Sequence, residues 1–355
     1  MDILNNKVDD LKDLLIEDIL DIVKIPSVKG KATNGFPFGE NVAKALNKAL
    51  EISEKLGFKT KNLDNYIGYA DYGEGEDYIC IIGHIDVVKE GSGWTYPPYS
   101  GHIENGNIYA RGVLDNKGPI ISALYGLYAI KELGIKLYKK VRVIFGTDEE
   151  SGFGDIPYYL ENEKEPIMGF TPDCKYPVVY GEKGMARFKV TSTNNIDEDA
   201  FVSFLDNLSS NIMVTYKDVY KDVYKDDDNL VLDFKVKYDF NYTLEDVIDE
   251  IKKSISNDIN IETVLNFNPV YFDKESKLVK SLQVAYERVT NLDGTPVTTN
   301  GGTYAKVMPN IVPFGPSFPG QKGIAHNENE YMSIDDIILN TKIFANAIYE
   351  LAREE

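Results

Sequence analysis

The side chains that could do chemistry lie in five short stretches, and the first holds His84 and Asp86 directly after an apolar run. In an extended strand, residues two apart share a face, so these two side chains are expected to point the same way. A carboxylate beside an imidazole can orient that imidazole as a metal ligand. Taken alone, the pair is explained more simply as a polar cap on the end of a strand.

Carboxylates dominate the next two stretches. Asp115 lies between Gly112 and Gly118, and these glycines would let the loop approach a metal ion closely. On its own, Asp115 has the commoner role of a carboxylate at the start of a helix. Glu149 and Glu150 are adjacent and rarely face the same way, so one can hold a metal ion while the other accepts a proton from water. A solvated acidic turn is the alternative.

Asp173 and His326 mark the last two stretches. Pro172 and Pro177 stiffen the loop that presents Asp173, although a simple Asx turn also explains this loop. His326 lies among acidic and amide groups, and burying such a loop without a metal ion or tight hydrogen bonds would be costly. The third histidine, His102, lies in a turn-like stretch and is predicted to be an ordinary surface residue.

Alternating strands and helices are predicted to position these side chains. The run at 78–83 is apolar throughout, as in a central strand buried on both faces. The stretches with His84 and Glu149 follow such strands, where α/β proteins place ligand sites. The alternation predicts an α/β layer. Its expected elements are helices at 8–23, 41–56, 119–133 and 333–353 and strands at 78–83 and 141–145.

The pattern changes after Gly184. The order strand, helix, strand, strand, helix, strand is typical of a small α+β, ferredoxin-like domain with two helices on one face of its sheet. We therefore expect an inserted domain at 186–292 and a first domain made of 1–185 and 293–355. The expected elements of the insert are strands at 187–192, 213–224, 230–238 and 259–270 and helices at 197–208 and 243–255.

Composition narrows the classes of function. The chain of 355 residues has a formal net charge of −19, which argues against nucleic acids and anionic membrane surfaces as partners. Its two cysteines predict neither a disulfide framework nor a cysteine zinc site. We find no signal-like N-terminus and no stretch apolar enough to span a membrane, so the expected location is the cytoplasm.

Taken together, the five stretches resemble, in their order, those of the two-zinc peptidases, a family that includes aminoacylases, glutamate carboxypeptidases, succinyl-diaminopimelate desuccinylases and PepV-type dipeptidases. The resemblance covers 84–173 and 301–331, including the glycine- and proline-rich parts at 301–305 and 313–320. It is closest to the PepV-type dipeptidases, in the segments Thr-Pro-Asp-Cys-Lys-Tyr-Pro at 171–177 and Ala-His-Asn-Glu-Asn-Glu-Tyr at 325–331.

The resemblance implies a fold and a set of roles. The first domain would be zinc-peptidase-like, with a mixed central sheet flanked by helices, and the insert would be a lid and dimerisation domain in a homodimer. Glu149 would be the general base, Asp86 would orient His84, and the Asp115–Asn116 peptide would be cis. Two divalent ions, zinc with manganese or cobalt as substitutes, would be held by His84, Asp115, Glu150, Asp173 and His326, with Asp115 shared.

The implied reaction is metal-dependent hydrolysis of an amide bond in a small substrate, a dipeptide first of all. An N-acyl amino acid deacylase would use the same metal centre. A metal-binding relative with little or no catalysis is a further alternative, because members of the family place a histidine in the lid and this insert contains none. The candidates for substrate binding are Gly302, Thr303, Lys306 and Arg288.

Overall fold

The computed structural model describes residues 2–192, 198–208, 212–214, 222–226, 229–254 and 259–354. The chain forms two compact units. The larger unit consists of Met1–Val179, Asp273–Val297 and Thr303–Glu355. The smaller unit consists of Tyr180–Phe272 and Thr298–Gly302.

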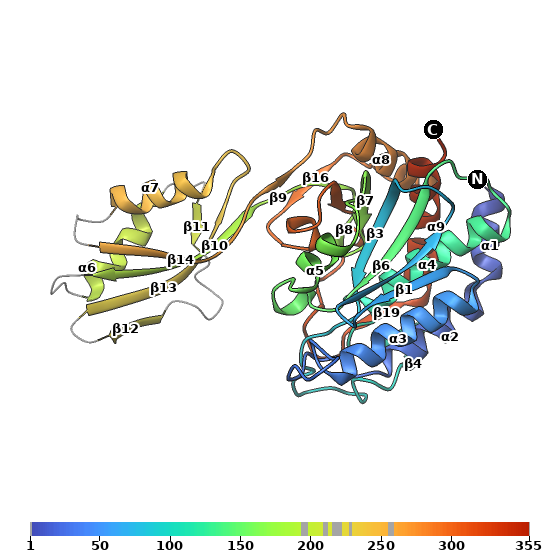
Figure 1. Ribbon diagram of the computed structural model, residues 1–355, viewed down its shortest axis with the longest axis horizontal. Coiled ribbons are helices and arrows are strands. Elements are labelled where there is room, and N and C mark those ends of the chain that lie inside the picture. Colours follow the sequence, from blue (N-terminus) through green and yellow to red (C-terminus); the bar gives the residue numbers. More distant parts are fainter. Residues whose placement is uncertain are drawn as a thin grey trace. The chain divides into compact units, whose positions relative to one another are not determined.

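A six-stranded mixed sheet is the centre of the larger unit (Figure 1). The strands β3, β6, β7 and β17 are parallel, whereas β1 and β2 are antiparallel to their neighbours. Every residue of β3 is buried, as its apolar sequence predicted. The order across the sheet is β1 (Lys59–Leu63), β2 (Ile67–Tyr72), β6 (Lys140–Gly146), β3 (Tyr78–His84), β7 (Met168–Thr171) and β17 (Ile311–Pro313).

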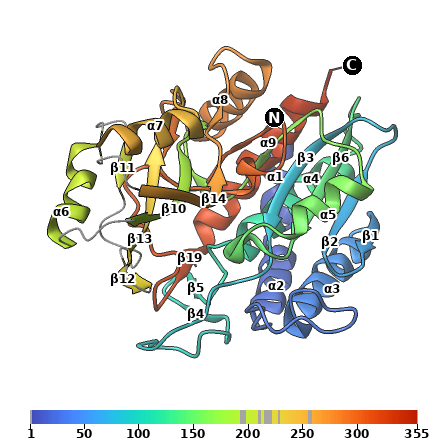
Figure 2. The same cartoon turned by 60° about the vertical axis from the view of Figure 1, so that its left-hand side comes forward.

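Helices cover both faces of this sheet. Gly68 of β2 faces α3, since a Cβ at this position would lie 2.9 Å from Leu46. The next residue, Tyr69, points to the opposite face, where its ring contacts Tyr159 of α5. α4 and α9 pack on each other and on β3 and β6, as Figure 2 shows. These helices are α3 (Glu40–Lys55), α4 (Lys117–Glu132), α5 (Asp155–Asn162) and α9 (Ile334–Ala352).

The predicted helix at 8–23 is instead two helices, α1 (Asp2–Asp10) and α2 (Lys12–Val23). They separate at Leu11; both pack on α4, whereas α1 also packs on α9 and α2 also packs on α3. The other predicted helices and strands of this domain are confirmed within a few residues at each end. Within the described ranges, no helix combines the length and apolarity needed to cross a bilayer.

Shorter elements complete the larger unit, and several of them border the site described below. The helical ones are α8 (Lys277–Thr290) and the 3-10 turns η1 (Glu149–Ser151) and η3 (Tyr304–Lys306). The extended ones are β4 (His102–Glu104), β5 (Asn107–Tyr109), β8 (Cys174–Lys175), β16 (Val297–Thr299), β18 (Pro316–Ser317) and β19 (Tyr331–Ser333).

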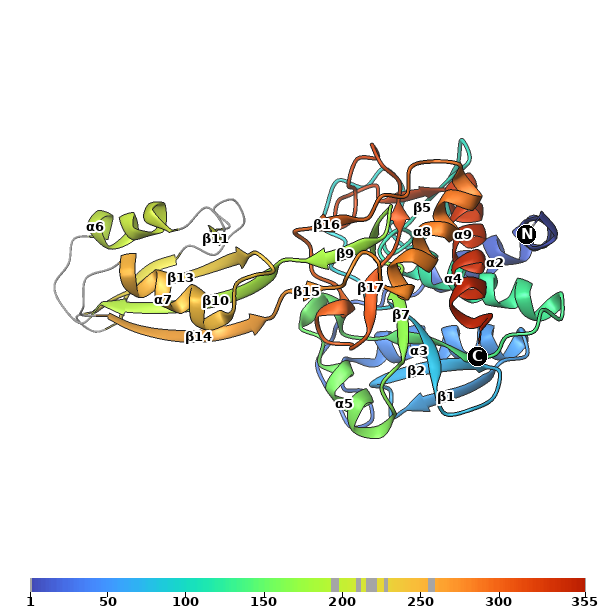
Figure 3. The same cartoon turned by 90° about the horizontal axis from the view of Figure 1, so that it is seen from above.

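The smaller unit is an antiparallel sheet with helices on one face, and Figure 3 shows β10, β13 and β14 side by side. Phe188 of β10 and Phe234 of β13 lie opposite each other and share a core with Phe204 and Val247 of the helical segments. The elements are β10 (Gly184–Ser192), α6 (Glu198–Val202), η2 (Ser203–Asn207), β11 (Ile212–Val214), β12 (Asp222–Asp226), β13 (Asn229–Tyr238), α7 (Leu244–Ser254) and β14 (Ile259–Phe267).

This order matches the α+β pattern expected of the insert, except that two short strands, β11 and β12, stand where one strand was expected at 213–224. Residues 215–221 of the strand expected at 213–224 lie outside the described residues. The borders of the units differ from the expected ones, since α8 belongs to the larger unit rather than to the insert. The reason is packing: α8 lies on α9 and buries Leu278, Leu282 and Tyr286. The sequence of a helix indicates which face is apolar, but it does not indicate which domain packs against that face.

Candidate metal centre

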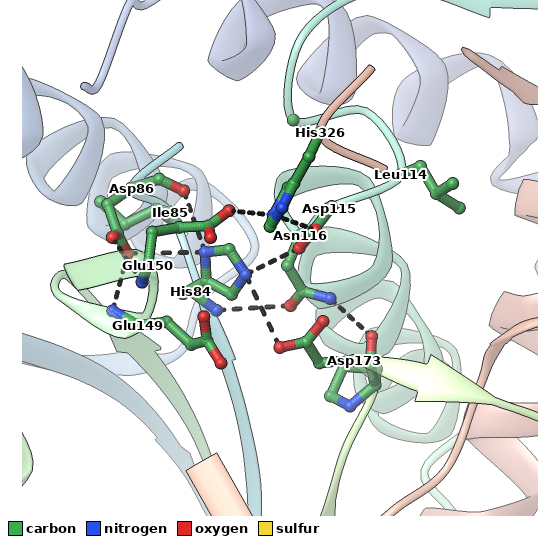
Figure 4. Close-up of polar contacts among 12 residues, drawn as sticks. His84, Ile85, Asp86, Leu114, Asp115, Asn116, Glu149, Glu150, Asp173 and His326 are labelled. Atoms are coloured by element: carbon green, nitrogen blue, oxygen red, sulfur yellow. Dashed lines mark hydrogen bonds and ion pairs between the residues drawn. The ribbon is translucent and has the colours of Figure 1, made fainter. Parts of the chain in front are cut away.

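The loops that follow three neighbouring parallel strands meet at one end of the larger sheet. His84 is the last residue of β3 and is fully buried. Glu149 and Glu150 follow β6, and Asp173 follows β7. Because β6, β3 and β7 are adjacent and parallel, their carboxyl ends lie together and bring these side chains into one cluster (Figure 4).

Asp115, from the loop before α4, is at the centre of this cluster. Its Oδ1 lies 2.9 Å from Nε2 of His84, and its Oδ2 lies 3.0 Å from Nε2 of His326. The same nitrogen of His326 lies 2.9 Å from Oε1 of Glu150. Nε2 of His84 lies 3.6 Å from Oδ2 of Asp173. One carboxylate therefore faces two separate groups of side chains, one with each oxygen.

Asp86 fixes both the histidine and the glutamates. Nδ1 of His84 is 2.9 Å from the backbone carbonyl of Asp86, which leaves Nε2 directed at Asp115. The carboxylate oxygens of Asp86 accept hydrogen bonds from the backbone N–H groups of Glu149 and Glu150, both at 3.2 Å. The sequence predicted that the carboxylate of Asp86 would orient His84; its Oδ1 lies 3.4 Å from Nδ1, farther than the backbone carbonyl. The contacts with the glutamate backbone were not foreseen.

Asn116 joins two of these loops. Its Oδ1 accepts a hydrogen bond from the backbone N–H of His84 at 3.3 Å, and its Nδ2 donates to the carbonyl of Pro172 at 2.6 Å. The Asp115–Asn116 peptide is cis, as expected from the family resemblance. Gly83 makes room for this side chain, since a Cβ there would lie 2.2 Å from Oδ1 of Asn116.

Burial and mutual repulsion act on the two glutamates. Burial raises the pKa of the Glu149 carboxyl well above its usual range, and the negative charge of Asp173 raises it further. Burial also raises the pKa of Glu150, although the hydrogen bond from His326 opposes this. The cluster therefore gathers more negative charge than it neutralises, which is the electrostatic condition for cation binding.

The histidines respond to the same carboxylates. Hydrogen bonds to Asp115 and Glu150 raise the pKa of His326 to about 10. Burial opposes the charged form of His84, but Asp115 and Asp86 outweigh it and raise its pKa well above the usual value. Burial likewise opposes the charged form of Asp115, and the two histidines outweigh it and lower its pKa. A cation that binds here would displace protons from the histidines.

The donor atoms fit divalent metal ions. Ligand atoms of His84, Glu149 and Asp173 lie within 4.8 Å of one another, and so do those of His84, Asp115 and Glu150. Imidazole nitrogen and carboxylate oxygen are ligands that zinc and manganese accept. His326, which lies beside Asp115 and Glu150, adds a second imidazole. His102, by contrast, stacks on Tyr96 at 3.8 Å between ring centroids and belongs to neither of these groups of candidate ligands.

The sequence model of peptidase family M20/M25/M40 matches residues 80–350, which include every member of the cluster. The chain belongs to this family. The resemblance inferred from the five stretches is thereby confirmed, and this M20-family chain is a hydrolase of the metallopeptidase class.

Relatives of known name align with nearly the full length of this M20-family chain. "Putative dipeptidase YtjP" of Bacillus subtilis (strain 168) is 30% identical over 453 aligned positions that cover 96% of this chain and 98% of the relative. Beta-Ala-Xaa dipeptidase of Lactobacillus delbrueckii subsp. lactis is 28% identical, with 97% of each chain covered. The first alignment is longer than the 355 residues of this chain, so the relative contains segments that this chain lacks.

A solved structure shows the same fold. The Bacillus subtilis YXEP protein, described as a dinuclear metal binding peptidase of the M20 family, aligns with a TM-score of 0.73 at 13% identity. The alignment covers 97% of this chain and 99% of the other.

A second carboxylate, Asp155, supports the loop that carries Glu149 and Glu150. The sequence analysis did not predict this role. Oδ2 of Asp155 accepts hydrogen bonds from the backbone N–H of Thr147 at 2.7 Å and from the Tyr304 hydroxyl at 2.5 Å. Burial raises the pKa of Asp155 to about 7. Gly146 leaves space for the phenol ring, since a Cβ there would lie 2.0 Å from its oxygen. The glycine at 146, directly after a predicted strand, was the available signal.

The candidates for substrate binding lie in different places. Thr303 is buried and its hydroxyl caps η3 by accepting from the N–H of Ala305 at 3.1 Å. Lys306 ends η3, two residues after Tyr304, whose hydroxyl is bonded to Asp155. Gly302 belongs to the smaller unit.

Arg288 is not part of the cluster, and its expected role is corrected here. Its guanidinium is bonded to Glu350 at 2.5 Å. Glu350 lies in the last turn of α9. This end of α9 lies beside the start of β6, because the carbonyl of Ala352 accepts a hydrogen bond from the N–H of Tyr138, two residues before β6 begins. The metal-binding cluster lies at the opposite end of β6, and a strand of this length separates its two ends by on the order of 20 Å. Arg288 ties α8 to α9.

Proposed function

We propose that this M20-family chain hydrolyses the amide bond of a dipeptide, using two divalent cations held at the cluster around Asp115. The observation that carries the proposal is the placement of the Asp115 carboxylate, whose two oxygens face His84 and His326 separately. A shared carboxylate between two groups of ligands suits a pair of cations. The names of the two dipeptidase relatives support the class of substrate.

The ligand sets follow from the contacts. We assign His84, Asp115 and Asp173 to one cation, and Asp115, Glu150 and His326 to the other. Zinc is the proposed metal, because imidazole and carboxylate ligands in this number suit it, and manganese or cobalt would also be accepted. When bound, the pair of cations would lower the pKa of a water molecule and polarise the scissile carbonyl.

Glu149 is the proposed general base. It stands beside Asp173 and His84 and is assigned to neither cation, so its carboxylate is available to take a proton from water and return it to the leaving amine. The raised pKa of Glu149 suits an acid–base group that must work in both directions near neutral pH. Asp86 is a positioning residue, because it holds the backbone of Glu149 and the ring of His84.

The test of this function combines metal content with a substrate panel. Purified protein is analysed for bound metals, then supplied with zinc, manganese or cobalt and assayed on dipeptides and on N-acyl amino acids. Two metal ions per chain with cleavage of dipeptides would support the proposal. Cleavage of acyl amino acids alone would make the chain a deacylase. Two metal ions with no turnover would favour the silent alternative, and no bound metal would overturn the proposal.

Replacing Lys306 with methionine is expected to raise KM for a dipeptide roughly 10–100-fold, with a smaller effect on kcat. We propose that this ammonium group binds the substrate carboxylate, because η3 is anchored beside the glutamate loop through Tyr304 and Asp155. Arg288→Met is the matched control and should leave KM unchanged, since Arg288 is bonded to Glu350, which also retains Arg353 as a partner. Equal effects of the two substitutions would refute the assignment.

We also propose that the protein is a cytoplasmic homodimer that pairs through its smaller unit. β14 is an edge strand, with Val264 and Leu265 each nearly 40% exposed (39% and 38%). An edge strand with exposed apolar side chains is suited to pairing with a second chain. Light scattering should give a mass twice the 39.9 kDa of the chain, and Val264→Lys should shift it toward the monomer. A monomeric wild-type protein would contradict the proposal, and cell fractionation checks the location.

A further inference from the structure

Glu330 is a fully buried carboxylate that lies four residues after His326. Its Oε1 accepts hydrogen bonds from three backbone N–H groups, those of Gly112 at 3.0 Å, Leu114 at 2.9 Å and Asp115 at 3.1 Å. All three lie in the loop that carries the shared carboxylate. Glu330 thus contacts the backbone of Asp115 and leaves both side-chain oxygens of Asp115 directed at the histidines.

The second oxygen of Glu330 completes the attachment. Its Oε2 accepts from Nη1 of Arg111 at 2.6 Å, and Arg111 is itself almost completely buried. The backbone carbonyl of Glu330 accepts from the N–H of Ala110 at 3.1 Å. One residue further on, β19 pairs with β5, with Tyr331 opposite Tyr109. Several hydrogen bonds in a row therefore connect the segment that follows His326 to the segment that ends in Asp115.

These hydrogen bonds determine how close the side chains of Asp115 and His326 lie to each other. The chain from Glu330 back to His326 is only four residues long and has a left-handed backbone at both Asn329 and His326, with φ of 58° and 65°. Its far end is fixed where His326 meets Asp115 at 3.0 Å. A buried charge of this kind is stable only when it is paired and hydrogen-bonded, so the four donors hold Glu330 in one place.

We infer that Glu330 is a positioning residue for the metal centre: it holds the Asp115 and His326 loops together and so fixes the pair of ligands proposed for the second cation. The inference rests on the proposed function, because it presumes that Asp115 and His326 are ligands. The arrangement also explains why a carboxylate, and not an amide, is required. Both oxygens must accept, one from three backbone donors and the other from a guanidinium.

Glu330→Gln is the test, because glutamine keeps the shape but replaces one acceptor with a donor. Metal affinity is measured by titration against a chromophoric chelator, at a temperature where circular dichroism shows each variant to be folded. The affinity for one of the two ions is expected to fall about 10–100-fold. The other ion, held also by His84 and Asp173, should be affected less. A general loss of structure would weaken both ions alike.

Two further variants make the test specific. Glu328→Gln is the matched control, since Glu328 is an exposed carboxylate in the same loop, and it should bind both ions like the wild type. Glu330→Asp keeps the charge but is one methylene too short to reach both loops, so it should lose affinity as Glu330→Gln does. It also decides the question if the glutamine variant does not fold.

The outcomes separate this inference from the proposed function. Loss of one ion in both Glu330 variants but not in Glu328→Gln supports the inference. Unchanged affinity in Glu330→Gln overturns it, even if the wild type cleaves dipeptides. If Glu330→Asp binds both ions like the wild type while Glu330→Gln does not, the inference is also overturned, because the charge of residue 330 alone would then be sufficient. A wild-type protein that binds no metal overturns the proposed function, and this inference with it.

Discussion

Replacing Glu149 with glutamine is expected to lower kcat for dipeptide hydrolysis by about 10²–10⁴-fold while both metal ions remain bound. Glutamine has the shape of the glutamate side chain but cannot take the proton from water. The backbone N–H of residue 149 would still donate to Asp86, so the loop keeps its place. The measurement is kcat at saturating metal together with metal content per chain.

The neighbouring glutamate provides the control. Glu150→Gln should lower metal affinity, because Oε1 of Glu150 lies 2.9 Å from His326 in the second proposed ligand set. The two substitutions are chemically identical and one residue apart, so a difference between them must come from their roles. Loss of metal in Glu149→Gln would contradict the prediction and make Glu149 a ligand, an assignment its proximity to His84 and Asp173 also allows.

Replacing Asp115 with alanine is expected to remove both metal ions and to abolish hydrolysis. Each oxygen of this carboxylate faces a different histidine, so its loss takes a ligand from both proposed sets. Metal ligands that are carboxylates also supply charge, and without Asp115 the positive histidines would repel a cation more strongly. Elemental analysis after dialysis, followed by assay with added zinc, measures both effects.

Asp173→Ala distinguishes a shared ligand from an unshared one. Asp173 approaches His84 at 3.6 Å and belongs to only one proposed set, so this variant should keep one ion per chain. If Asp115→Ala and Asp173→Ala retain the same amount of metal, Asp115 is not shared between two ions. Retention of two ions in Asp115→Ala would refute the entire placement of the metal centre.

The core of the site could be predicted from the joint occurrence of the five stretches, although each stretch alone has a simpler explanation. His84 ends one apolar strand and Glu149 follows shortly after another, and the carboxyl ends of adjacent parallel strands meet at one edge of a sheet. Glu330 and Asp155 have no such signature. Glu330 bonds to backbone groups more than 200 positions away, and any residue type supplies a backbone N–H, so nothing in the sequence around Gly112 identifies its partner.

Packing explains the predictions that were wrong. Arg288 is a cation near a loop of interest in sequence, but its partner is Glu350 on α9, and only the tertiary fold brings those two together. The helix expected at 8–23 has continuous apolar spacing, yet it is interrupted at Leu11, and the two helices share α4 but differ in their other neighbours, α9 for α1 and α3 for α2. Periodicity identifies a buried face and is silent about what covers it.

The main segment of the smaller unit, Tyr180–Phe272, begins and ends at two antiparallel strands, and the short segment Thr298–Gly302 joins the same unit later in the chain. β9 (Val179–Glu182) and β15 (Val270–Tyr271) lie side by side, with Gly181 opposite Tyr271, and the N–H of Phe272 donates to the carbonyl of Tyr180 at 2.8 Å. Two adjacent antiparallel strands can be closed by a two-residue hairpin. The insert can therefore be excised, or exchanged for one of another length, at a junction that contains none of the proposed ligands. A lineage could enlarge or trim this module while its metal chemistry stays constant, and a protein engineer has the same freedom to graft there.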